Sequence, residues 1–388
     1  MPIRNRLAEL HPEITGWRRH LHENPELLYE VHETAAFVAE RLKEMGVDEI
    51  TPGIGKTGVV AVIKGKTDTS GRVIGLRADM DALPIHEASG VDYASKVPGK
   101  MHACGHDGHT SILLGAAKYL AETRNFDGTA VFIFQPAEEG GAGAKAMCDD
   151  GLMARWGIQE VYGLHNAPGV PTGSFAIRPG ALLASSDEFE ITVTGKGGHA
   201  AAPHDAVDTT LVASQIVVSL QSVVSRTIDP IKRVVLTVGT FNTDSSASNI
   251  IAHQAILEGT VRTLDSECRA LAQERVNAIV AGTAAAFGAT AEVVWTSGYP
   301  VTVNHDDQTA FAADAARAVA GDVIDDVDPI MPSEDFAYML EERPGAYMFL
   351  GNGDTAQCHH PAYVFDDEAI PAGSSWFVEL VERRMPAA

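Results

Sequence analysis

The chain has 388 residues, of which 29 are Lys or Arg and 52 are Asp or Glu, so its formal net charge is −23. At roughly 150 residues per domain, this length predicts two or three domains. A hydrophobic share of 45% and a charged share of 21% are typical of a folded protein and exclude a disordered chain. The acidic balance repels phosphate backbones and anionic lipids, which argues against nucleic acid and membrane partners.

The N-terminal segment MPIRNRLAELHPEI is charged and amphipathic, unlike a secretory signal. No uncharged run of 18 apolar residues follows in the sequence, so we expect a cytoplasmic protein without a membrane span. The chain has four cysteines, at positions 104, 148, 268 and 358. Their irregular spacing in a chain long enough to build its own core disfavours a disulfide framework. At least one thiol is therefore expected to be free for other chemistry.

Predicted helices and strands alternate over the first 185 residues. Apolar residues recur at steps of three and four between residues 7 and 21, which predicts a helix. Further helices are expected over about 33–45 and 109–123, and β-branched runs predict strands that begin near residues 58, 72, 129 and 161. This alternation indicates an α/β layer structure with a mainly parallel central sheet flanked by helices.

The pattern changes between residues 186 and 298. There the predicted order is strand, helix, two strands, helix, strand, which is the split βαβ or ferredoxin-like α+β arrangement. After residue 299 the sequence returns to a helix-rich α/β pattern. We therefore predict that 1–185 and 299–388 are two parts of one α/β domain, with 186–298 inserted as a second domain.

Residue types that bind metals are densest in the segment MHACGHDGHT, residues 101 to 110, which holds His102, Cys104, His106 and His109. Cys104 and His106 are two residues apart, so in an extended loop both side chains would project to the same side, as metal ligands must. A lone histidine is more often a helix cap or a core residue. Three other segments favour a metal site, because each places ligand-type residues just beyond a predicted strand.

Those segments are RADMDALP with Asp79 and Asp81, QPAEEGG with Glu138 and Glu139, and GLHN with His165. A further segment, CHHPAY, returns from the far end of the chain. Because loops beyond the carboxyl ends of strands form the ligand crevice of an α/β sheet, these segments are expected to converge. A solvated turn is the simpler account of two adjacent glutamates, but here an apolar strand precedes them and two glycines follow.

The adjacent carboxylates of Glu138 and Glu139 suggest divided labour, in which one ligates a metal and the other accepts a proton from the attacking water. Two cations about 3.5–4 Å apart would lower the pKa of that water and polarise a carbonyl group. A thiolate among nitrogen and oxygen ligands favours zinc over magnesium or calcium and leaves manganese, cobalt and nickel open. The pattern therefore predicts amide hydrolysis at a metal centre.

The same motifs occur in order with HLHENPEL, GKGGHAAAPH and SEDFAY between residues 20 and 361. In this combination the chain resembles the aminoacylase and carboxypeptidase superfamily of dinuclear metallohydrolases. Within it, the motifs resemble the branch of hippurate hydrolase, N-acyl-amino-acid amidohydrolases and auxin-conjugate (IAA-amino acid) hydrolases. The resemblance implies that 1–185 and 299–388 form the catalytic domain, and that 186–298 is a lid that also forms the dimer interface.

The resemblance also implies a set of site residues. Five side chains would ligate two divalent ions, with zinc or manganese expected and cobalt or nickel open: Cys104, His106, Glu139, His165 and His359. Cys104 would bridge the ions, His106 and His359 would complete one site, and Glu139 and His165 would complete the other. Glu138 would be the general base and later the acid that protonates the leaving amine.

Two positions are left open. His359 is chosen as the last ligand because the branch has its ligand histidine two residues before a proline, here Pro361, and His360 is the alternative. Asp79 stands where related peptidases have a metal-binding histidine, so its role is undetermined.

The resemblance of the inserted domain implies three further residues. His199, in GKGGHAAAPH, would stabilise the tetrahedral oxyanion, often from the neighbouring subunit. Asn249 and Arg262 match lid positions that contact the carboxylate or carbonyl of the substrate. A surface residue paired with a nearby acid is an equally good account of Arg262 on sequence alone.

The predicted function is a metal-dependent amidohydrolase that splits the amide bond of an N-acyl-L-amino acid, hippurate-like or N-acetylated, into a carboxylic acid and a free amino acid. The expected partners are this small molecule and further copies of the chain, in a homodimer or a dimer of dimers. The alternative is a dipeptidase or carboxypeptidase at the same ions. Rivals of other classes are a metal-free cysteine amidase with Cys104 as nucleophile, and a binding protein on an inactive scaffold.

Overall fold

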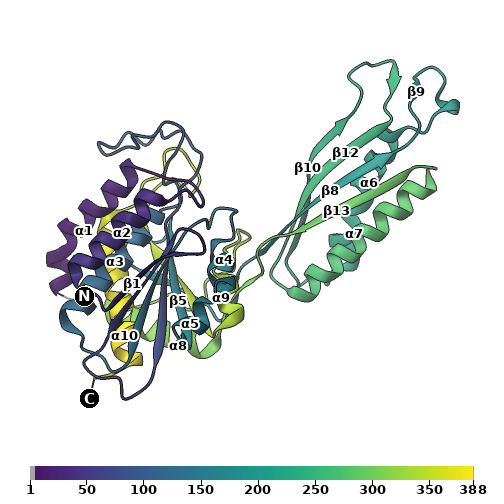
Figure 1. The fold of residues 1–388 in the computed structure, drawn as a ribbon. Coiled ribbons are helices and arrows are strands. Elements are labelled where there is room, and N and C mark those ends of the chain that lie inside the picture. The colour runs from purple at the N-terminus through teal and green to yellow at the C-terminus, as the bar shows by residue number, and fades with distance from the viewer. Residues whose placement is uncertain (1–4, 388) are drawn as a thin grey trace. The chain divides into compact units, whose positions relative to one another are not determined.

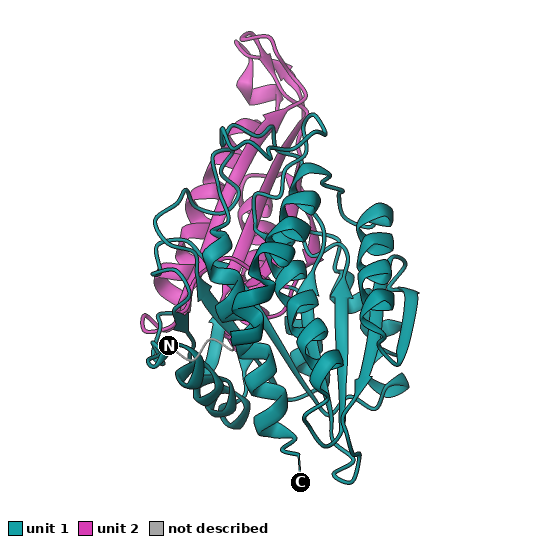
Figure 2. Ribbon diagram, turned by 90° about the vertical axis from the view of Figure 1, so that its left-hand side faces the viewer, with its two compact units in different colours: residues 1–182, 303–328, 335–388 teal, residues 183–302, 329–334 magenta. Residues whose placement is uncertain are grey.

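The computed structural model of the chain describes residues 5–387 (Figure 1). These residues divide into two compact units, which Figure 2 colours separately. Unit 1 comprises Met1–Leu182, Val303–Asp328 and Asp335–Ala388, and unit 2 comprises Leu183–Thr302 and Pro329–Glu334. Each unit has its own sheet and its own hydrophobic core.

Unit 1 is built on a seven-stranded sheet. In spatial order its strands are β1 (Glu49–Ile54), β2 (Gly58–Lys64), β4 (Thr129–Gln135), β3 (Val73–Asp79), β5 (Glu160–Ala167), β15 (Gly345–Gly351) and β6 (Phe175–Ala176). The four strands β4, β3, β5 and β15 are parallel, and the strands outside them are antiparallel. The central strands are almost entirely buried, which explains their continuous apolar runs.

Helices of unit 1 lie beside this sheet. They are α1 (Asn5–Glu23), α2 (His32–Met45), α3 (His106–Thr123), α4 (Gly143–Asp149), α5 (Leu152–Arg155), α8 (Asp306–Ala320), α9 (Ala337–Glu342), η3 (Asp367–Ala369) and α10 (Ile370–Arg384). The apolar stripe of α1 is the face that the helix buries. Helices α1, α3 and α10 pack against one another, so the beginning and the end of the chain meet on α3 (Figure 1).

Unit 2 contains a four-stranded antiparallel sheet. Its main elements are β8 (Ser185–Thr194), α6 (Thr209–Ser222), β10 (Val234–Thr243), β12 (Gln254–Thr263), α7 (Ser266–Ala286) and β13 (Thr290–Ser297), with the spatial strand order β10-β12-β8-β13. Shorter elements are β9 (Gly198–His199), η1 (Pro203–Asp205), η2 (Val223–Thr227) and β11 (Ile250–Ile251). β7 (Gly180–Leu183) and β14 (Thr302–Asn304) stand where the chain passes between the units. Asp208 and Asp265 cap α6 and α7 by accepting backbone N–H groups.

The predicted fold class is confirmed, since a mainly parallel sheet with helices and a separate split βαβ arrangement are both present. Unit 2 spans 183–302 and also takes 329–334, compared with the predicted 186–298. Its role as a lid and the catalytic role of unit 1 stay predictions. Within residues 5–387, no helix combines the length and the apolar character that crossing a bilayer requires.

The structure adds one strand and corrects one local prediction. Within the α/β pattern predicted after residue 299, Gly345–Gly351 forms β15, which lies between β5 and β6 in the sheet. His106 does not lie in an extended loop with Cys104, because it is the first residue of α3. Gly105 between them has φ 91°, a left-handed conformation that turns the chain into the helix.

Candidate metal centre

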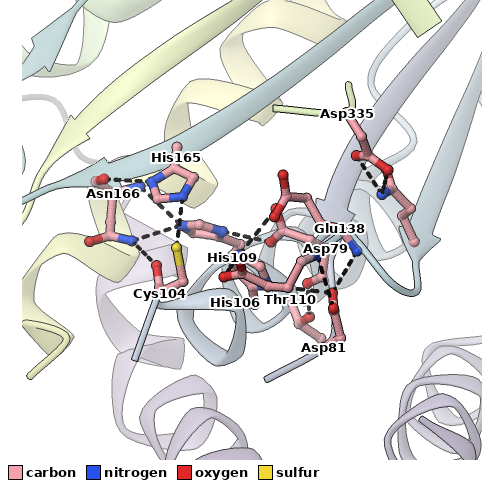
Figure 3. A network of polar contacts seen from close by, with 12 residues as sticks. Asp79, Asp81, Cys104, His106, His109, Thr110, Glu138, His165, Asn166 and Asp335 are labelled. Carbon is pink, nitrogen blue, oxygen red and sulfur yellow. Dashed lines mark hydrogen bonds and ion pairs between the residues drawn. The ribbon is translucent and has the colours of Figure 1, made fainter. Parts of the chain in front are cut away.

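The predicted site residues of unit 1 gather at the carboxyl-terminal ends of its parallel strands (Figure 3). Asp79 is the last residue of β3, Glu138 and Glu139 follow β4, and His165 lies near the end of β5. Parallel strands end at the same edge of a sheet, so loops that are distant in sequence meet there. Cys104 and His106 join them from the start of α3.

Five side chains that the sequence predicts as ligands come together here. The ligand atoms of Cys104, His106 and His165 lie within 4.8 Å of one another, and so do those of Cys104, Glu139 and His359. The Cys104 Sγ atom is 3.4 Å from His165 Nε2, and His359 Nε2 is 3.3 Å from Glu139 Oε1. Cys104 is thus common to two groups, which is the geometry that a bridging ligand requires.

The other four proposed ligands are not paired in the way that the resemblance implies. His106 lies with His165, and Glu139 lies with His359, whereas the sequence paired His106 with His359 and Glu139 with His165. His106 also shares a group with Glu138 and Glu139, so the groups overlap.

The donor set fits divalent ions. Among the described residues, neither ring nitrogen of the buried His106 has a hydrogen-bond partner, and the nearest carboxylate oxygens are 3.6–3.9 Å away. The Glu139 Oε1 atom makes no hydrogen bond within residues 5–387, and its ion-pair contacts are with His359 Nε2 at 3.3 Å and His106 Nε2 at 3.9 Å. Polar atoms buried without a partner cost free energy, which a cation between them would offset. Thiolate, imidazole and carboxylate donors together suit a borderline ion such as zinc.

The turn that carries Glu138 and Glu139 is held by one carboxylate. Asp81 accepts the backbone N–H of Glu138 at 2.9 Å and that of Glu139 at 3.2 Å. Asp81 Oδ1 also lies 3.6 Å from His106 Nδ1. Because two consecutive backbone N–H groups donate to one buried side chain, Asp81 fixes the turn that carries the proposed general base.

Asp79 and His109 lie close to the ligands, but their polar atoms are already engaged. His109 Nδ1 donates to Asp79 Oδ1 at 2.7 Å, and His109 Nε2 accepts the backbone N–H of Asn166 at 2.9 Å. Arg77 Nη1 donates to the other Asp79 oxygen at 2.7 Å. Burial alone would raise the pKa of Asp79, but His106, Arg77 and His109 together lower it well below its usual range. Although Asp79, His106 and His109 lie near enough to hold an ion, this saturation makes Asp79 and His109 scaffold residues.

Asp335 is fully buried in unit 1 and was not among the predicted site residues. Asp335 accepts hydrogen bonds from Arg77 Nη2 at 3.1 Å, Gln135 Nε2 at 2.8 Å and the backbone N–H of Ala144 at 2.8 Å. These contacts hold the end of β4 and the start of α4 on either side of the glutamate turn. The signal was Arg77 within a strongly apolar strand, since a buried guanidinium needs carboxylate partners.

The loop that carries His359 is strained and tied to the Cys104 loop. His359 has φ 67°, a left-handed conformation that is uncommon for residues other than glycine and clusters at functional sites. Its backbone N–H donates to Ala103 O at 2.8 Å, and the Cys358 Sγ atom is 3.9 Å from Cys104 O. Both contacts join segments that lie about 254 residues apart in the sequence.

The three predicted residues of unit 2 do not form one cluster. His199 in β9 pairs with Ile250 in β11, and Ala200 N–H donates to Asn249 O at 3.0 Å, so His199 and Asn249 are neighbours. Arg262 stands eight positions along β12 from Gln254, the strand end nearest this hairpin, a separation of roughly 26 Å at 3.3 Å per residue. Arg262 Nη1 donates to Ser333 Oγ at 3.1 Å instead.

A family model for peptidase family M20/M25/M40 matches residues 75–383. The chain belongs to this family.

Proteins of similar sequence align with nearly the whole chain. An N-acetyl-L-cysteine deacetylase of Bacillus subtilis is 44% identical over 378 residues, which cover 97% of this chain and 89% of that protein. A hippurate hydrolase of Campylobacter jejuni is 43% identical over 376 residues, 96% of this chain and 97% of that protein. Among solved structures, a Bacillus subtilis protein described as a dinuclear metal binding peptidase from the M20 family is 36% identical. It has a TM-score of 0.86 and covers 98% of this chain and 100% of its own.

Proposed function

We propose that this member of the M20 family is a metal-dependent amidohydrolase that hydrolyses N-acyl-L-amino acids to a carboxylic acid and a free amino acid. One observation carries the proposal: Cys104 is shared by two groups of ligand atoms, and Glu138 lies against them, in a group with His106 and Glu139. The names of the relatives, a deacetylase and a hippurate hydrolase, support the substrate class.

The site would hold two divalent ions, with zinc or manganese proposed and cobalt or nickel as alternatives. Cys104, His106 and His165 would hold one ion, and Cys104, Glu139 and His359 would hold the other, following the distances between their atoms. A solved relative described as dinuclear supports the number of ions. His359 is preferred over His360, because His359 Nε2 lies 3.3 Å from Glu139.

The chemistry follows from the positions of the carboxylates. Bound ions would polarise the amide carbonyl and lower the pKa of a water molecule. Glu138 would accept a proton from that water as the C–O bond forms, and would return it to the nitrogen as the C–N bond breaks. Asp81 keeps Glu138 in place through the backbone of the turn. His199 is proposed to stabilise the oxyanion, and Asn249 and Arg262 to contact the substrate.

A homodimer, or a dimer of dimers, through unit 2 belongs to the same proposal. Leu211 and Val218 are 48% and 67% exposed on α6, and Phe241 is 41% exposed on the edge strand β10. Exposed apolar side chains on a helix and on an edge strand favour association with a second copy. Sedimentation of the purified chain would test this. The cytoplasmic location rests on the sequence alone, and Met1 to Arg4, where that argument begins, lie outside the described residues.

A substrate panel combined with metal removal tests the proposed function. Benzoylglycine, several N-acetyl-L-amino acids and free dipeptides are offered to the protein before dialysis, after dialysis against a chelator, and after zinc or manganese is restored. We expect cleavage of the N-acyl substrates, its loss with chelator, and its recovery with metal.

Other outcomes would favour one of the alternative functions. Preference for free dipeptides would favour the dipeptidase alternative. Activity that survives the chelator but is lost on thiol alkylation would point to a cysteine amidase. No turnover of any substrate by a protein loaded with metal would favour a binding protein.

A further inference from the structure

Asn166 follows the proposed ligand His165 and is almost fully buried, at 2% exposure. Its backbone N–H donates to His109 Nε2 at 2.9 Å. Its side-chain Nδ2 donates to Cys104 O at 2.5 Å and lies 3.1 Å from His109 Nε2 (Figure 3). Its Oδ1 atom accepts the hydroxyl of Tyr363 at 2.8 Å. One amide side chain therefore contacts the backbone of a proposed ligand, a buried imidazole and a phenol.

These contacts set the direction of the hydrogen bonds that His109 makes. Because His109 Nε2 faces two N–H donors of Asn166, it must be the acceptor nitrogen, so the ring proton sits on Nδ1 and is donated to Asp79. Arg77 in turn fixes Asp79. His109 therefore ties Asn166 to Asp79, the last residue of β3.

The same residue also sets the ligand atom of His165. His165 Nδ1 donates to the carbonyl oxygen of Asn166 at 2.7 Å, which leaves Nε2 as the nitrogen with a free lone pair. That nitrogen is the one that lies 3.4 Å from Cys104 Sγ. Asn166 therefore contacts Cys104 through its side chain and His165 through its backbone.

The contact between Asn166 and the Cys104 carbonyl leaves no room for a side chain at position 105. A Cβ atom on Gly105 would lie 2.3 Å from Asn166 Nδ2 and 2.6 Å from the Tyr363 hydroxyl. Glycine at position 105 thus allows the Asn166 amide to reach the Cys104 carbonyl. Tyr363 joins the segment that follows His359 to the same point.

We infer that Asn166 is a positioning residue for the ion held by Cys104, His106 and His165, with His109 and Tyr363 fixing its orientation. The inference rests on the metal centre of the proposed function. Residues that orient metal ligands typically change metal affinity by about 10–100-fold when they are replaced. The ion at Glu139 and His359 shares only Cys104 with this contact, so it should be affected less.

The test measures bound metal rather than turnover. Wild type and Asn166→Ala are dialysed against buffered free Zn²⁺ over a range of concentrations, and zinc per chain is determined by elemental analysis. We expect one of the two binding steps to weaken by about 10–100-fold in Asn166→Ala, while the other step changes far less. With Co²⁺ in place of zinc, the thiolate-to-cobalt absorption should shift, since the Cys104 loop moves.

Asn304 offers a matched control. It is 1% exposed, its Nδ2 donates to Arg178 O and Tyr347 O at 3.0 Å, and its Oδ1 accepts the backbone N–H of Tyr347 at 2.7 Å. None of these partners belongs to a loop that carries a proposed ligand. Asn304→Ala should therefore lower folding stability as Asn166→Ala does, yet bind both zinc ions with wild-type affinity.

Two results would overturn the inference: unchanged affinity for both ions in Asn166→Ala, or an equal loss in both alanine variants. If Asn166→Ala does not fold, Tyr363→Phe decides, because it removes only the hydroxyl that Asn166 accepts. That variant should weaken the same step by a smaller factor, and unchanged binding would overturn the inference. A wild type that binds two ions but leaves every N-acyl substrate intact contradicts the proposed function alone. A wild type that binds none contradicts both.

Discussion

At the scale of single residues, the proposed site depends on a carboxylate that is not one of the proposed metal ligands. Asp81 accepts two consecutive backbone N–H groups and thereby fixes which of two adjacent glutamates faces which neighbour. Glu139 then lies 3.3 Å from His359 Nε2, and Glu138 lies in a group with His106. The proposed division of labour between the two glutamates would therefore be a property of the turn, because the two side chains are chemically identical.

This division predicts the effect of Glu138→Gln. The amide keeps the size and polarity of the side chain but loses its basicity, so we expect both ions to remain bound and kcat to fall by a factor on the order of 10² or more. Steady-state kinetics and elemental analysis of the same preparation provide the two measurements. Glu30→Gln is the control, because the Glu30 side chain is 80% exposed and lies outside the site. Near-normal turnover by Glu138→Gln would remove Glu138 from its proposed role.

Most residues of the candidate site could be predicted from the sequence, but the contacts between them could not. Ligand-type residues after strands identified Glu139 and His165 as neighbours, since strand ends converge in any parallel sheet, and the density of such residues around Cys104 identified the third. Asn166 and Asp335 were missed, because an amide or a carboxylate has no ligand signature until its partners are known. The grouping of ligands around Cys104 likewise depends on distances that spacing does not encode.

At the scale of elements, the start of α3 connects the fold to the site. Helix α3 is buried along most of its length against α1, α2 and α10, so its first turn is held by the whole core of unit 1. Gly105 makes the turn into the helix with φ 91°, directly between Cys104 and His106. The positions of two proposed ligands are therefore set by one glycine and one rigid helix.

Gly105→Ala should consequently damage both stability and metal binding. The alanine requires an unfavourable left-handed conformation, worth about 1 kcal/mol, and its Cβ would also clash with Asn166 and Tyr363. We expect the free energy of unfolding in urea to fall by several kcal/mol and zinc content to drop.

Gly46→Ala separates these two effects. Gly46 follows α2 with φ 69°, and nothing lies within 4 Å of the position of its missing Cβ. It should lose only about 1 kcal/mol and keep both zinc ions. Equal losses of stability in the two variants would show that the clash at residue 105 is relieved at little cost.

The elements themselves were predictable where their periodicity was strong. The stripe of α1 and the alternating strands of unit 2 follow directly from apolar spacing. Strand β15 was missed because GAYMFLG is apolar at nearly every position, and a short buried strand of this kind has no period that distinguishes it from a buried helix. Its place in the sheet is decided by pairing with β5, about 180 residues earlier in the chain.

At the scale of the whole molecule, the proposed metal ligands are confined to one unit. All five proposed ligands and Glu138 belong to unit 1, although they come from positions 104 to 359. Unit 2 interrupts this sequence without contributing a ligand, and its core is closed by its own helices and sheet. Binding of ions should therefore stabilise the two units unequally.

Removing the ions makes this inequality measurable. A ligand that binds only the folded state adds about 4 kcal/mol when its free concentration is a thousand times Kd. Dialysis against a chelator should thus accelerate amide hydrogen exchange in β3, β4 and β5 by up to about 10³-fold, whereas β8, β12 and β13 of unit 2 should exchange at unchanged rates. Restoring zinc should reverse the effect, which provides the control against irreversible damage. Equal acceleration in both units would mean that they unfold as one cooperative body, and no change in either would mean that the ions are not bound by these loops.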